Sequence, residues 1–496
     1  MNQPLTMLAL ALVLAPLAAA LLIALGRGPR AADRITRSAA VLIAALGVAF
    51  AVVRTVGHQP VSTGGLLATD DAAALFVLVV TLVGAASALL SPGYLDSQQR
   101  SFFPAGRARY GYYVTFHCFW AALIAVPLAG NLGMAWLLVE ATTGASVLLV
   151  AFSGGRRALE AGWKYLVLTT LGLTVALLGI LLVLATGPSS ALGALDWNTL
   201  AHVSSGLPRP AALTAFLLIL AGLAAKIGWA PVHHWLPDAH SEAPPPVSAL
   251  LSAALLPSVM LVAWRVKIAL GAGIGRPVAA RLFLGFGLLS LAVAVPFLWR
   301  ALAWKRLLAY SSLEHMGVLA LGIGFGTPLA IAGVVVHVLS HALAKSLGFF
   351  TAVPLLQAQP DASHEPARGV ARNGAGLAGA FGISLGALSG LPPSPLFFSE
   401  VFILFAGFLS GHVVAALLGT ALLALGFLGL VHALIEGLLG ERGDPDAPAS
   451  APASVPLGRT LAGVTGTTSA LLAGLAAGAV FVPGSALVAA LSRWSA

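Results

Sequence analysis

One pattern repeats along the whole sequence: an apolar run of about twenty residues, followed by a short polar break. A helix that crosses the hydrocarbon core of a membrane needs about 20 such residues. The pattern predicts an all-α polytopic membrane protein, because helices satisfy their own backbone hydrogen bonds in lipid. About fourteen transmembrane helices are expected, at residues 5–26, 38–57, 72–92, 110–129, 131–152, 161–187, 211–230, 247–270, 279–299, 308–326, 328–356, 373–411 (interrupted), 413–438 and 459–491.

The composition also indicates lipid as the main solvent of the chain. Of its 496 residues, 59% are hydrophobic and 9% charged, whereas soluble domains are about 25% charged. The net charge of +9 does not indicate nucleic-acid binding, since no stretch interleaves basic and aromatic residues on a polar background. The single cysteine, Cys118, excludes an intrachain disulfide and any cysteine-held metal or iron–sulfur cluster. Residues 1–30 lack a basic n-region, so a retained first helix is expected rather than a cleaved signal peptide.

Basic residues in alternate loops predict the orientation of the chain, because cytoplasmic loops are enriched in Lys and Arg. The first three basic loops carry Arg27, Arg30, Arg34 and Arg37, then Arg100, Arg107 and Arg109, then Arg156, Arg157 and Lys164. This alternation predicts an N-terminus outside the cell. One group departs from it, on the predicted outer side: Arg265, Lys267, Arg276 and Arg281. Either the helix count shifts there, or these residues have local partners.

Two of the predicted spans contain helix breakers. Pro231 follows Lys226 by about one turn, and the run 386–404, "GALSGLPPSPLFFSEVFIL", places three prolines just before Glu400. Non-helical backbone at membrane depth is tolerated where it is buried in protein or lines a wet cavity. One break in each half of the chain is typical of transporters built from inverted repeats.

Ionisable residues inside the spans are the candidate functional residues, because a charge in the membrane interior is costly to keep. Glu140 lies halfway along a predicted span, and Lys226 ends the apolar run before the first break. Desolvation favours the neutral form of a buried lysine, so a facing carboxylate would control whether Lys226 keeps its proton. The alternatives are a structural carboxylate at Glu140 and a static ion pair that fixes helix packing.

His337, His341 and Lys345 are spaced by four residues in "HVLSHALAK", which places them on one helix face. Such a stripe suits proton transfer, because histidine titrates near physiological pH. A zinc site is one alternative, but the motif lacks the glutamate of HExxH and has no obvious third ligand. A role of the histidines in packing alone is the other alternative. Glu400 follows the second break and is expected to end the path.

Further polar residues near the breaks have weaker assignments. Lys305 and Arg306 mark a predicted cytoplasmic helix start, with Glu314 and His315 deeper in the same helix. Lys305 is either a boundary residue that reaches the interface or part of the path. One loop crowds together His233, His234, Asp238, His240 and Glu242. It could hold a metal, but its prolines favour a wet entrance to Lys226, to which His234 and Asp238 would contribute. His432 and Glu436 form a further pair near a predicted cytoplasmic end.

Five segments together resemble the antiporter-like, proton-conducting membrane subunits of respiratory complex I and its relatives. They are "LLVEATTGASVLLVAF", "KIGWAPVHHWLPDAHSEAPPPVSALLSAALL", "WKRLLAYSSLEHMG", "HVLSHALAKSL" and "LSGLPPSPLFFSE". They occur in the family's order over about residues 70–410. These segments are most similar to the component F branch of the family, which belongs to hydrogenase-4 and formate hydrogenlyase complexes.

The resemblance implies two inverted five-helix repeats, each with a broken helix, and a hydrated path along the middle of the membrane. It assigns that path to Glu140, Lys226, His337, His341, Lys345 and Glu400. Many relatives carry a lysine or histidine on the eighth helix, where this sequence has Ser252 and Pro257, so water near Ser252 would have to bridge the gap. Four parts of the chain are expected: N-terminal transmembrane helices at 1–108, a first antiporter-like repeat at 109–271, a second at 272–438, and a polar loop with a C-terminal transmembrane helix at 439–496.

The function that follows is proton translocation in a hydrogenase-4-like or NADH-dehydrogenase-like redox complex of a bacterial or archaeal cytoplasmic membrane. The expected partners are other antiporter-like subunits and peripheral nickel–iron hydrogenase-like or quinone-module subunits. This chain itself is expected to hold no cofactor or metal, because no nucleotide, flavin or quinone motif is present. Three other functions remain open: a sodium/proton antiporter module, a structural anchor, and the membrane half of an inorganic-carbon-uptake complex.

Overall fold

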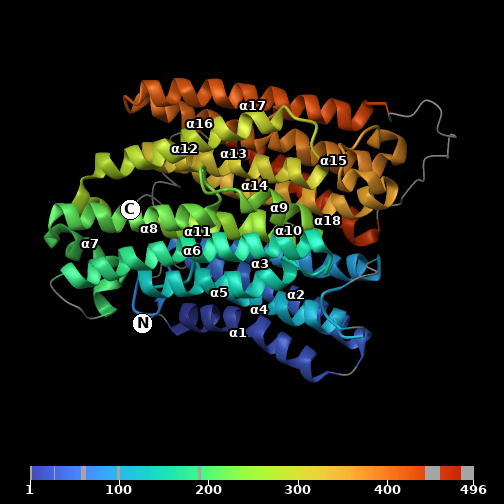
Figure 1. Cartoon of the computed structure of the whole chain (residues 1–496), viewed down its shortest axis with the longest axis horizontal. Coiled ribbons are helices and arrows are strands. Elements are labelled where there is room, and N and C mark those ends of the chain that lie inside the picture. The colour runs from blue at the N-terminus through green and yellow to red at the C-terminus, as the bar shows by residue number, and fades with distance from the viewer. Residues whose placement is uncertain are drawn as a thin grey trace. The chain divides into compact units, whose positions relative to one another are not determined.

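The computed structural model describes residues 3–26, 28–56, 63–97, 101–104, 106–187, 192–441 and 458–481. These residues are mainly helical (Figure 1). Two compact units divide the chain: unit 1 comprises Met1–Trp235 and Glu242–Leu282, and unit 2 comprises Leu236–Ser241 and Phe283–Ala496. Three sequence features fall outside the described residues: Arg27 and Arg100, most of the polar loop 441–459, and the end of the last predicted span.

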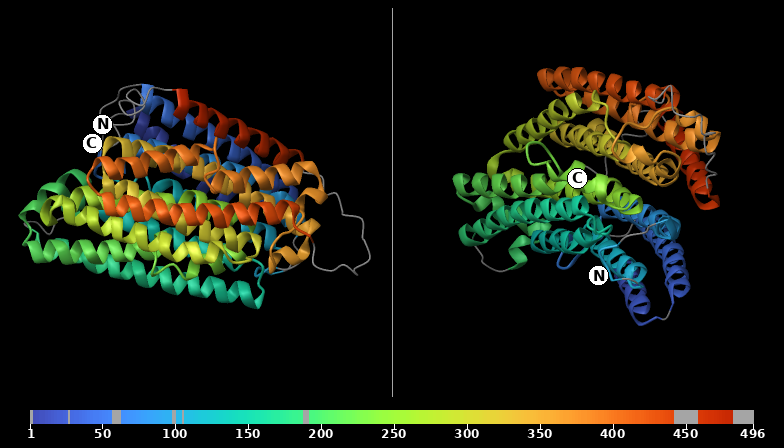
Figure 2. Two further views of the ribbon diagram at one scale, coloured as in Figure 1. Left: turned by 90° about the horizontal axis from the view of Figure 1, so that it is seen from above. Right: turned by 45° about the vertical axis from the view of Figure 1, so that its right-hand side comes forward.

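Unit 1 consists of long helices and one short hairpin. Its helices are α1 (Gln3–Leu25), α2 (Pro29–Val56), α3 (Asp71–Ser97), α4 (Ala108–Ala125), α5 (Leu132–Val150), α6 (Arg156–Thr186), α7 (Trp197–Gly206), α8 (Arg209–Ile227), α10 (Pro245–Leu250) and α11 (Leu256–Ile274), with a 3-10 turn at Leu192–Leu195. The hairpin pairs β1 (Thr63–Gly64) with β2 (Leu67–Ala68). A π-helical turn, Leu251–Leu255, joins α10 to α11, so that Pro245–Ile274 is one candidate span. In the left view of Figure 2, the long helices drawn in cyan and green run roughly parallel or antiparallel to one another.

Unit 2 is built around α14, which packs against α13, α15 and α16. Its helices are α13 (Trp304–Phe325), α14 (Pro328–Ala358), α15 (Ala375–Leu388), α16 (Pro395–Leu409), α17 (Val413–Leu439) and α18 (Arg459–Phe481), with 3-10 turns at Pro360–Ser363 and Val370–Asn373. Two helices contain residues of both units: α9 (Trp235–Glu242) and α12 (Arg276–Leu298).

The apolar side chains that remain exposed show that the outer helices face lipid. Leu14 of α1 is 58% exposed and Val414 of α17 is 72% exposed. By contrast, α13 has a fully buried apolar segment although it carries Glu314 and His315. Twelve helices of the described chain are long and apolar enough to cross a membrane, so the protein is an integral membrane protein.

The predicted number of about fourteen spans is not confirmed. The helix expected at 110–129 forms as α4, but α4 is not among the twelve candidate spans. The interrupted run 373–411 is divided into two shorter apolar helices, α15 and α16. The repeat boundaries at 108, 271 and 438 also stay a prediction, because the two units are defined by compactness and not by internal similarity.

Several helices begin earlier than their apolar runs. The predicted loop 27–37 is largely the first part of α2, which contains Arg30, Arg34 and Arg37. Likewise, α6 begins at Arg156 rather than near residue 161. Arginine is a good helix former, so backbone hydrogen bonding continues beyond the lipid-facing section that hydropathy detects.

Four basic residues lie on the side of the membrane that the loop charges predict to be outside, and one of them, Arg265, has clear local partners. The two terminal nitrogens of Arg265 are bound separately: Nη2 lies 2.9 Å from each carboxylate oxygen of Asp70, and Nη1 donates to the carbonyl oxygen of Pro127 at 2.9 Å. Arg265 is 8% exposed. A buried guanidinium held in this way stabilises the packing of unit 1. The enrichment of Lys and Arg in cytoplasmic loops concerns loop residues, so it does not determine on which side of the membrane Arg265 lies.

Both predicted helix breaks are present. The helix α8 ends at Ile227, and Gly228 takes a left-handed conformation with φ of 79°. The helix α15 ends at Leu388 and is followed by Gly390 with φ of 73°. Glycine reaches this region without a steric penalty, and the prolines that follow cannot continue the helices. Each break therefore brings polar side chains close to helix ends inside the protein.

Candidate functional site

Lys226 is the next-to-last residue of α8 and is completely buried. Its Nζ donates to the Thr143 hydroxyl at 2.7 Å and to the Tyr165 hydroxyl at 2.6 Å. It also lies 4.5 Å from the centroid of the Tyr165 ring, within the range of a cation–π contact. The immediate partners of this ammonium group are therefore hydroxyls and an aromatic face.

Glu140 lies on α5, one turn before Thr143, so the carboxylate and the hydroxyl share a helix face. The Thr170 hydroxyl of α6 donates to Glu140 Oε1 at 2.8 Å, while Oε2 has no hydrogen-bond partner among the described residues. No ion pair between Glu140 and Lys226 occurs in the described chain. In place of an ion pair, Lys226 bonds to hydroxyls, and one of these, Thr143, lies one helical turn from Glu140.

A close contact between α6 and α8 brings Lys226 to these hydroxyls. A Cβ atom on Gly222 would lie only 2.3 Å from the carbonyl oxygen of Gly172, so both helices need glycine there. Beyond the break, Trp235 Nε1 donates to the carbonyl oxygen of Ala225 at 2.7 Å. That bond satisfies a backbone group near the end of α8, as buried backbone requires.

In unit 2, the corresponding buried cation is Lys345 on α14. It is also completely buried, and its Nζ donates to the Leu308 carbonyl oxygen at 2.6 Å and to the Ser311 hydroxyl. Both partners lie on α13. Glu314 follows Ser311 by one turn and is 3% exposed, with no hydrogen-bond partner for its Oε2 in the described chain. A lysine, a hydroxyl and a carboxylate thus lie close together here as well.

Three buried imidazoles lie on the two helices that hold this lysine and its partners. His315 Nδ1 of α13 and His337 Nε2 of α14 are 3.1 Å apart and form a hydrogen bond. The other nitrogen of His337 lies 2.9 Å from the Ser399 hydroxyl of α16. The ring of His341 contacts that of His315 at a centroid distance of 5.2 Å, and neither of its nitrogens has a hydrogen-bond partner in the described chain. His337, His341 and Lys345 are all buried, at the expected four-residue spacing.

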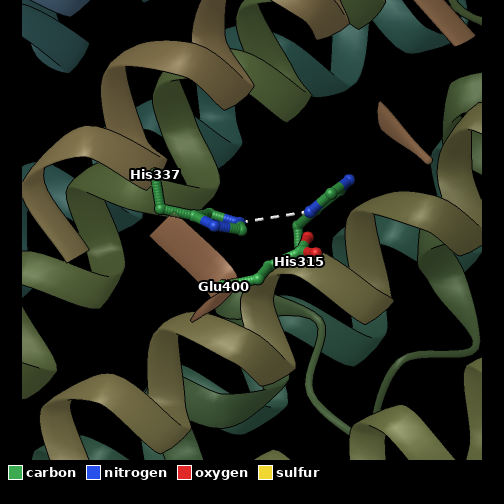
Figure 3. Close-up of side chains that lie close together, drawn as sticks. All are labelled: His315, His337 and Glu400. Carbon is green, nitrogen blue, oxygen red and sulfur yellow. Dashed lines mark hydrogen bonds between the residues drawn. The ribbon is translucent and has the colours of Figure 1, made fainter. Parts of the chain in front are cut away.

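Glu400 lies on α16, close to the second break. A Cβ atom on Gly390 would approach Glu400 Oε2 to 2.8 Å, so the glycine leaves room for the carboxylate. The ligand atoms of Glu400, His315 and His337 all lie within 4.8 Å of one another. In Figure 3, the His337 ring is directed at His315, and the Glu400 side chain reaches toward the same place.

The four weaker candidates have separate environments. Asp238 forms an ion pair with Arg306 at 3.3 Å in unit 2. Lys305 is half-buried in the first turn of α13, and Glu314 belongs to the lysine cluster described above. His234 is exposed and stacks on His233 at a centroid distance of 4.6 Å. Of the remaining loop residues, His240 is buried and its ring stacks on Phe349, one turn after Lys345.

Several residues of these clusters were not identified as site residues from the sequence: Thr143, Tyr165, Thr170, Ser311, His315 and Ser399. Their signal was the presence of hydroxyls and an imidazole within runs that are otherwise apolar. Local spacing does not show which of them face a lysine, because the hydrogen-bonded partners of Lys226 lie 83 and 61 positions away.

The helix is irregular at the position where this sequence has Ser252 in place of the lysine or histidine of many relatives. Ser252 is completely buried and lies in the π-helical turn Leu251–Leu255. The N–H of Leu256 donates to the Leu251 carbonyl oxygen, and Pro257 has no N–H to donate. π-Helical turns within helices occur often at functional sites. The bridging role of water near Ser252 stays a prediction.

Buried cations, carboxylates and imidazoles next to two broken helices define a polytopic membrane transport module, of the kind that moves ions through a protein interior. The sequence comparison identifies its family. Residues 129–426 match the family described as "NADH:quinone oxidoreductase/Mrp antiporter, TM", and the chain belongs to this family. It is therefore an antiporter-like membrane subunit, the class of proton-translocating modules that the sequence resemblance implied.

Known relatives agree with this assignment. The chain is 31% identical over 386 residues to the hydrogenase-4 component F homolog of Methylacidiphilum infernorum, covering 77% of this chain and 81% of the relative. It is similar in fold to a chain of the membrane-bound sulfane sulfur reductase, an archaeal respiratory membrane complex, with a TM-score of 0.83, 20% identity and coverage of 98% and 96%. A chain of the Mrp complex from Dietzia sp. DQ12-45-1b gives a TM-score of 0.81, 18% identity and coverage of 100% and 98%.

Proposed function

We propose that this chain carries protons across the membrane as a subunit of a hydrogenase-4-like or NADH-dehydrogenase-like redox complex. One observation supports this most directly. Each unit contains a completely buried lysine bonded to a hydroxyl that lies one helical turn from a carboxylate. Family membership and the similarity to a hydrogenase-4 component are the independent support.

In unit 1, the proposed path uses Glu140 and Lys226. Burial disfavours the ammonium form of Lys226, and the negative charge of Glu140 favours it. A movement that changes the distance between the two groups would therefore load or release a proton at Nζ. The hydroxyls of Thr143 and Tyr165 can accept a hydrogen bond from the lysine and donate one onward, so they serve as positioning groups on this path.

In unit 2, the proposed path uses Lys345, His341, His337 and Glu400. A neutral imidazole carries one donor and one acceptor nitrogen, so the bonded pair His315–His337 can pass a proton from one ring to the next. Glu400 lies beside the second break and would be the last proton acceptor on the path. We include Glu314 and His315 in the path, because both lie next to Lys345 or its histidine partners.

The proposed partners are other antiporter-like membrane subunits and a peripheral redox module that is hydrogenase-like or quinone-reducing. The relatives support a multi-subunit setting, because the two matched structures are parts of membrane complexes. The redox chemistry would occur in the partners, and this chain would hold no cofactor. We place it in a bacterial or archaeal cytoplasmic membrane with the N-terminus outside, on the basis of the loop charges.

A sodium/proton antiporter module is the second candidate. The fold similarity to a chain of the Mrp complex favours it, and the unpartnered oxygen of Glu140 could accept a hard cation. The two functions differ in their dependence on sodium, because a proton path needs none.

Proton flux through the full chain in liposomes tests the proposal. A potassium diffusion potential would drive protons inward, and a trapped pH-sensitive dye would report the internal pH. We expect flux above that of empty liposomes, independent of sodium, and its loss in Lys226→Ala. Flux that requires sodium would favour the antiporter, while flux equal to empty liposomes would contradict conduction by this chain.

The composition of the native complex tests the partner assignment. The chain would be purified in mild detergent, and the co-purifying proteins identified by mass spectrometry. Nickel–iron hydrogenase-like or quinone-module subunits are expected. Recovery of antiporter-like subunits alone would remove the redox assignment and favour cation/proton exchange.

A further inference from the structure

We propose that His315, His337 and Glu400 form a binding site for a divalent transition metal, with Zn²⁺ as the best fit. The three residues come from α13, α14 and α16 of unit 2, and their ligand atoms lie within 4.8 Å of one another. Figure 3 shows the three side chains converging. Neither the family match nor the relatives point to such a site.

The distance between the two imidazoles fits a shared metal. A tetrahedral zinc ion with Zn–N bonds of about 2.0–2.1 Å places two ligand nitrogens about 3.3 Å apart. His315 Nδ1 and His337 Nε2 lie 3.1 Å apart. Without a metal this is a hydrogen bond, so one of the two nitrogens carries a proton. Metal binding would release that proton, and only a small separation of the rings would be needed.

The chemistry of the donors selects the class of metal. Two imidazoles and one carboxylate, with an open fourth position for water, form a ligand set that zinc proteins use. Imidazole suits Zn²⁺, Co²⁺, Ni²⁺ and Cu²⁺, whereas Mg²⁺ and Ca²⁺ prefer oxygen ligands alone. Local spacing around His337 and His341 revealed no third ligand, because the partners of His337 come from other helices.

The surroundings support the ligands of this site. The second nitrogen of His337 bonds to the buried hydroxyl of Ser399, an arrangement that fixes ring orientation in metal sites. Glu314, next to His315 on α13, is also buried, and its Oε2 has no hydrogen-bond partner in the described chain. Glu400 is only partly buried, so the site is not sealed on its side.

A consequence follows for transport, and it rests on the proposed proton path. A bound metal occupies the lone pairs through which His315 and His337 would exchange a proton, and it neutralises Glu400. Zn²⁺ would therefore inhibit proton flux from within the protein.

Co²⁺ binding to the purified full chain tests the site without any transport measurement, because Co²⁺ bound by nitrogen and carboxylate ligands absorbs visible light. The chain would be purified without a histidine tag. We expect about one tightly bound Co²⁺ per chain, displaced by Zn²⁺. His315→Ala and Glu400→Gln should each weaken binding at least tenfold, and Ser399→Ala about tenfold through loss of ring orientation.

His432→Ala is the matched control, because His432 lies beside a carboxylate, Glu436, at 3.6 Å but is 63% exposed. This variant should keep the Co²⁺ band. Loss of the band in His432→Ala, or its persistence in both His315→Ala and Glu400→Gln, would overturn the proposal. Thermal unfolding of each variant shows whether it is folded. If the ligand variants do not fold, Ser399→Ala still tests the site, because it keeps all three ligands and should only weaken binding.

Zn²⁺ inhibition of proton flux separates the two proposals. Binding together with inhibition supports both. Binding with undiminished flux keeps the metal site and counts against the proton path through His315 and His337. Flux that is insensitive to Zn²⁺ in a chain that does not bind Co²⁺ removes the metal site and leaves the proton path intact.

Discussion

The two units hold a buried lysine in similar ways but surround it with different groups. Lys226 in unit 1 contacts two hydroxyls and an aromatic ring, and Lys345 in unit 2 contacts a hydroxyl and a backbone carbonyl. The hydroxyl follows the carboxylate by three residues on α5 but precedes it by three residues on α13. Unit 2 adds three imidazoles, whereas hydroxyls are the nearest groups to Lys226. The common elements are therefore a lysine, a hydroxyl and a carboxylate.

One ion pair of unit 1 is more buried than one of unit 2. In unit 1, Arg265 is 8% exposed and its partner Asp70 21%. In unit 2, Arg368 is 39% exposed and its partner Glu436 33%. An ion pair contributes more rigidity where water does not compete for it. We infer that the Arg265 pair restrains unit 1 more strongly than the Arg368 pair restrains unit 2.

The largest expected effect is the loss of proton flux when either lysine is removed. Glutamine keeps much of the length of lysine but cannot release a proton, so Lys226→Gln and Lys345→Gln should each lower flux in liposomes at least tenfold. Lys164→Gln is the control, because Lys164 is 45% exposed on α6 and pairs with Glu160. Loss of flux in only one lysine variant would show that the two lysines are not both required.

The next effect concerns the ion pairs. Arg265→Gln leaves the Asp70 carboxylate without its guanidinium partner in unit 1, which should lower stability by about 3–5 kcal/mol. Arg368→Gln in unit 2 removes a more exposed pair and should cost about 0–1 kcal/mol. Denaturation in detergent, followed by circular dichroism, measures both. Equal losses would contradict the inferred difference between the two ion pairs.

A smaller effect is expected at the crossing of α6 and α8. Gly222→Ala places a methyl group against the Gly172 carbonyl and should destabilise unit 1 by about 1–3 kcal/mol through overpacking. Gly144→Ala on α5 is the control, because a Cβ atom there meets nothing within 4 Å. That control should be neutral or stabilising by about 0.5–1 kcal/mol. If Gly222→Ala behaves like Gly144→Ala, close packing does not fix the position of Lys226.

The smallest effect is expected from the loss of one hydroxyl. Thr143→Val keeps the shape of the side chain but removes one of the two hydroxyl acceptors of Lys226, which should cost about 1 kcal/mol and slow flux several-fold. Thr142→Val is the control, because in the described part of the chain its hydroxyl donates to the Val139 carbonyl of its own helix. A similar change in flux in both variants would show that the hydroxyl at Thr143 has no specific role.

Much of the fold and part of the site could be predicted from the sequence. Hydropathy located most of the long helices, and glycine with proline located both breaks. The spacing of His337, His341 and Lys345 placed them on one buried face. The absence of a direct contact between Glu140 and Lys226 could not be predicted, because it depends on how far α5 and α8 approach each other. The pairing of His315 with His337 depends on the packing of α13 against α14.

The sequence by itself determined that this chain is helical, lies in a membrane and keeps ionisable groups near two helix breaks. The physical reason is local: in lipid, each backbone polar group needs a partner within its own segment, and apolar length sets each span. Only the tertiary structure decided which groups meet. Lys226 bonds to Thr143, 83 positions away, and His337 bonds to Ser399, 62 positions away. Contacts of this kind arise from helix packing around small residues, which no local periodicity encodes.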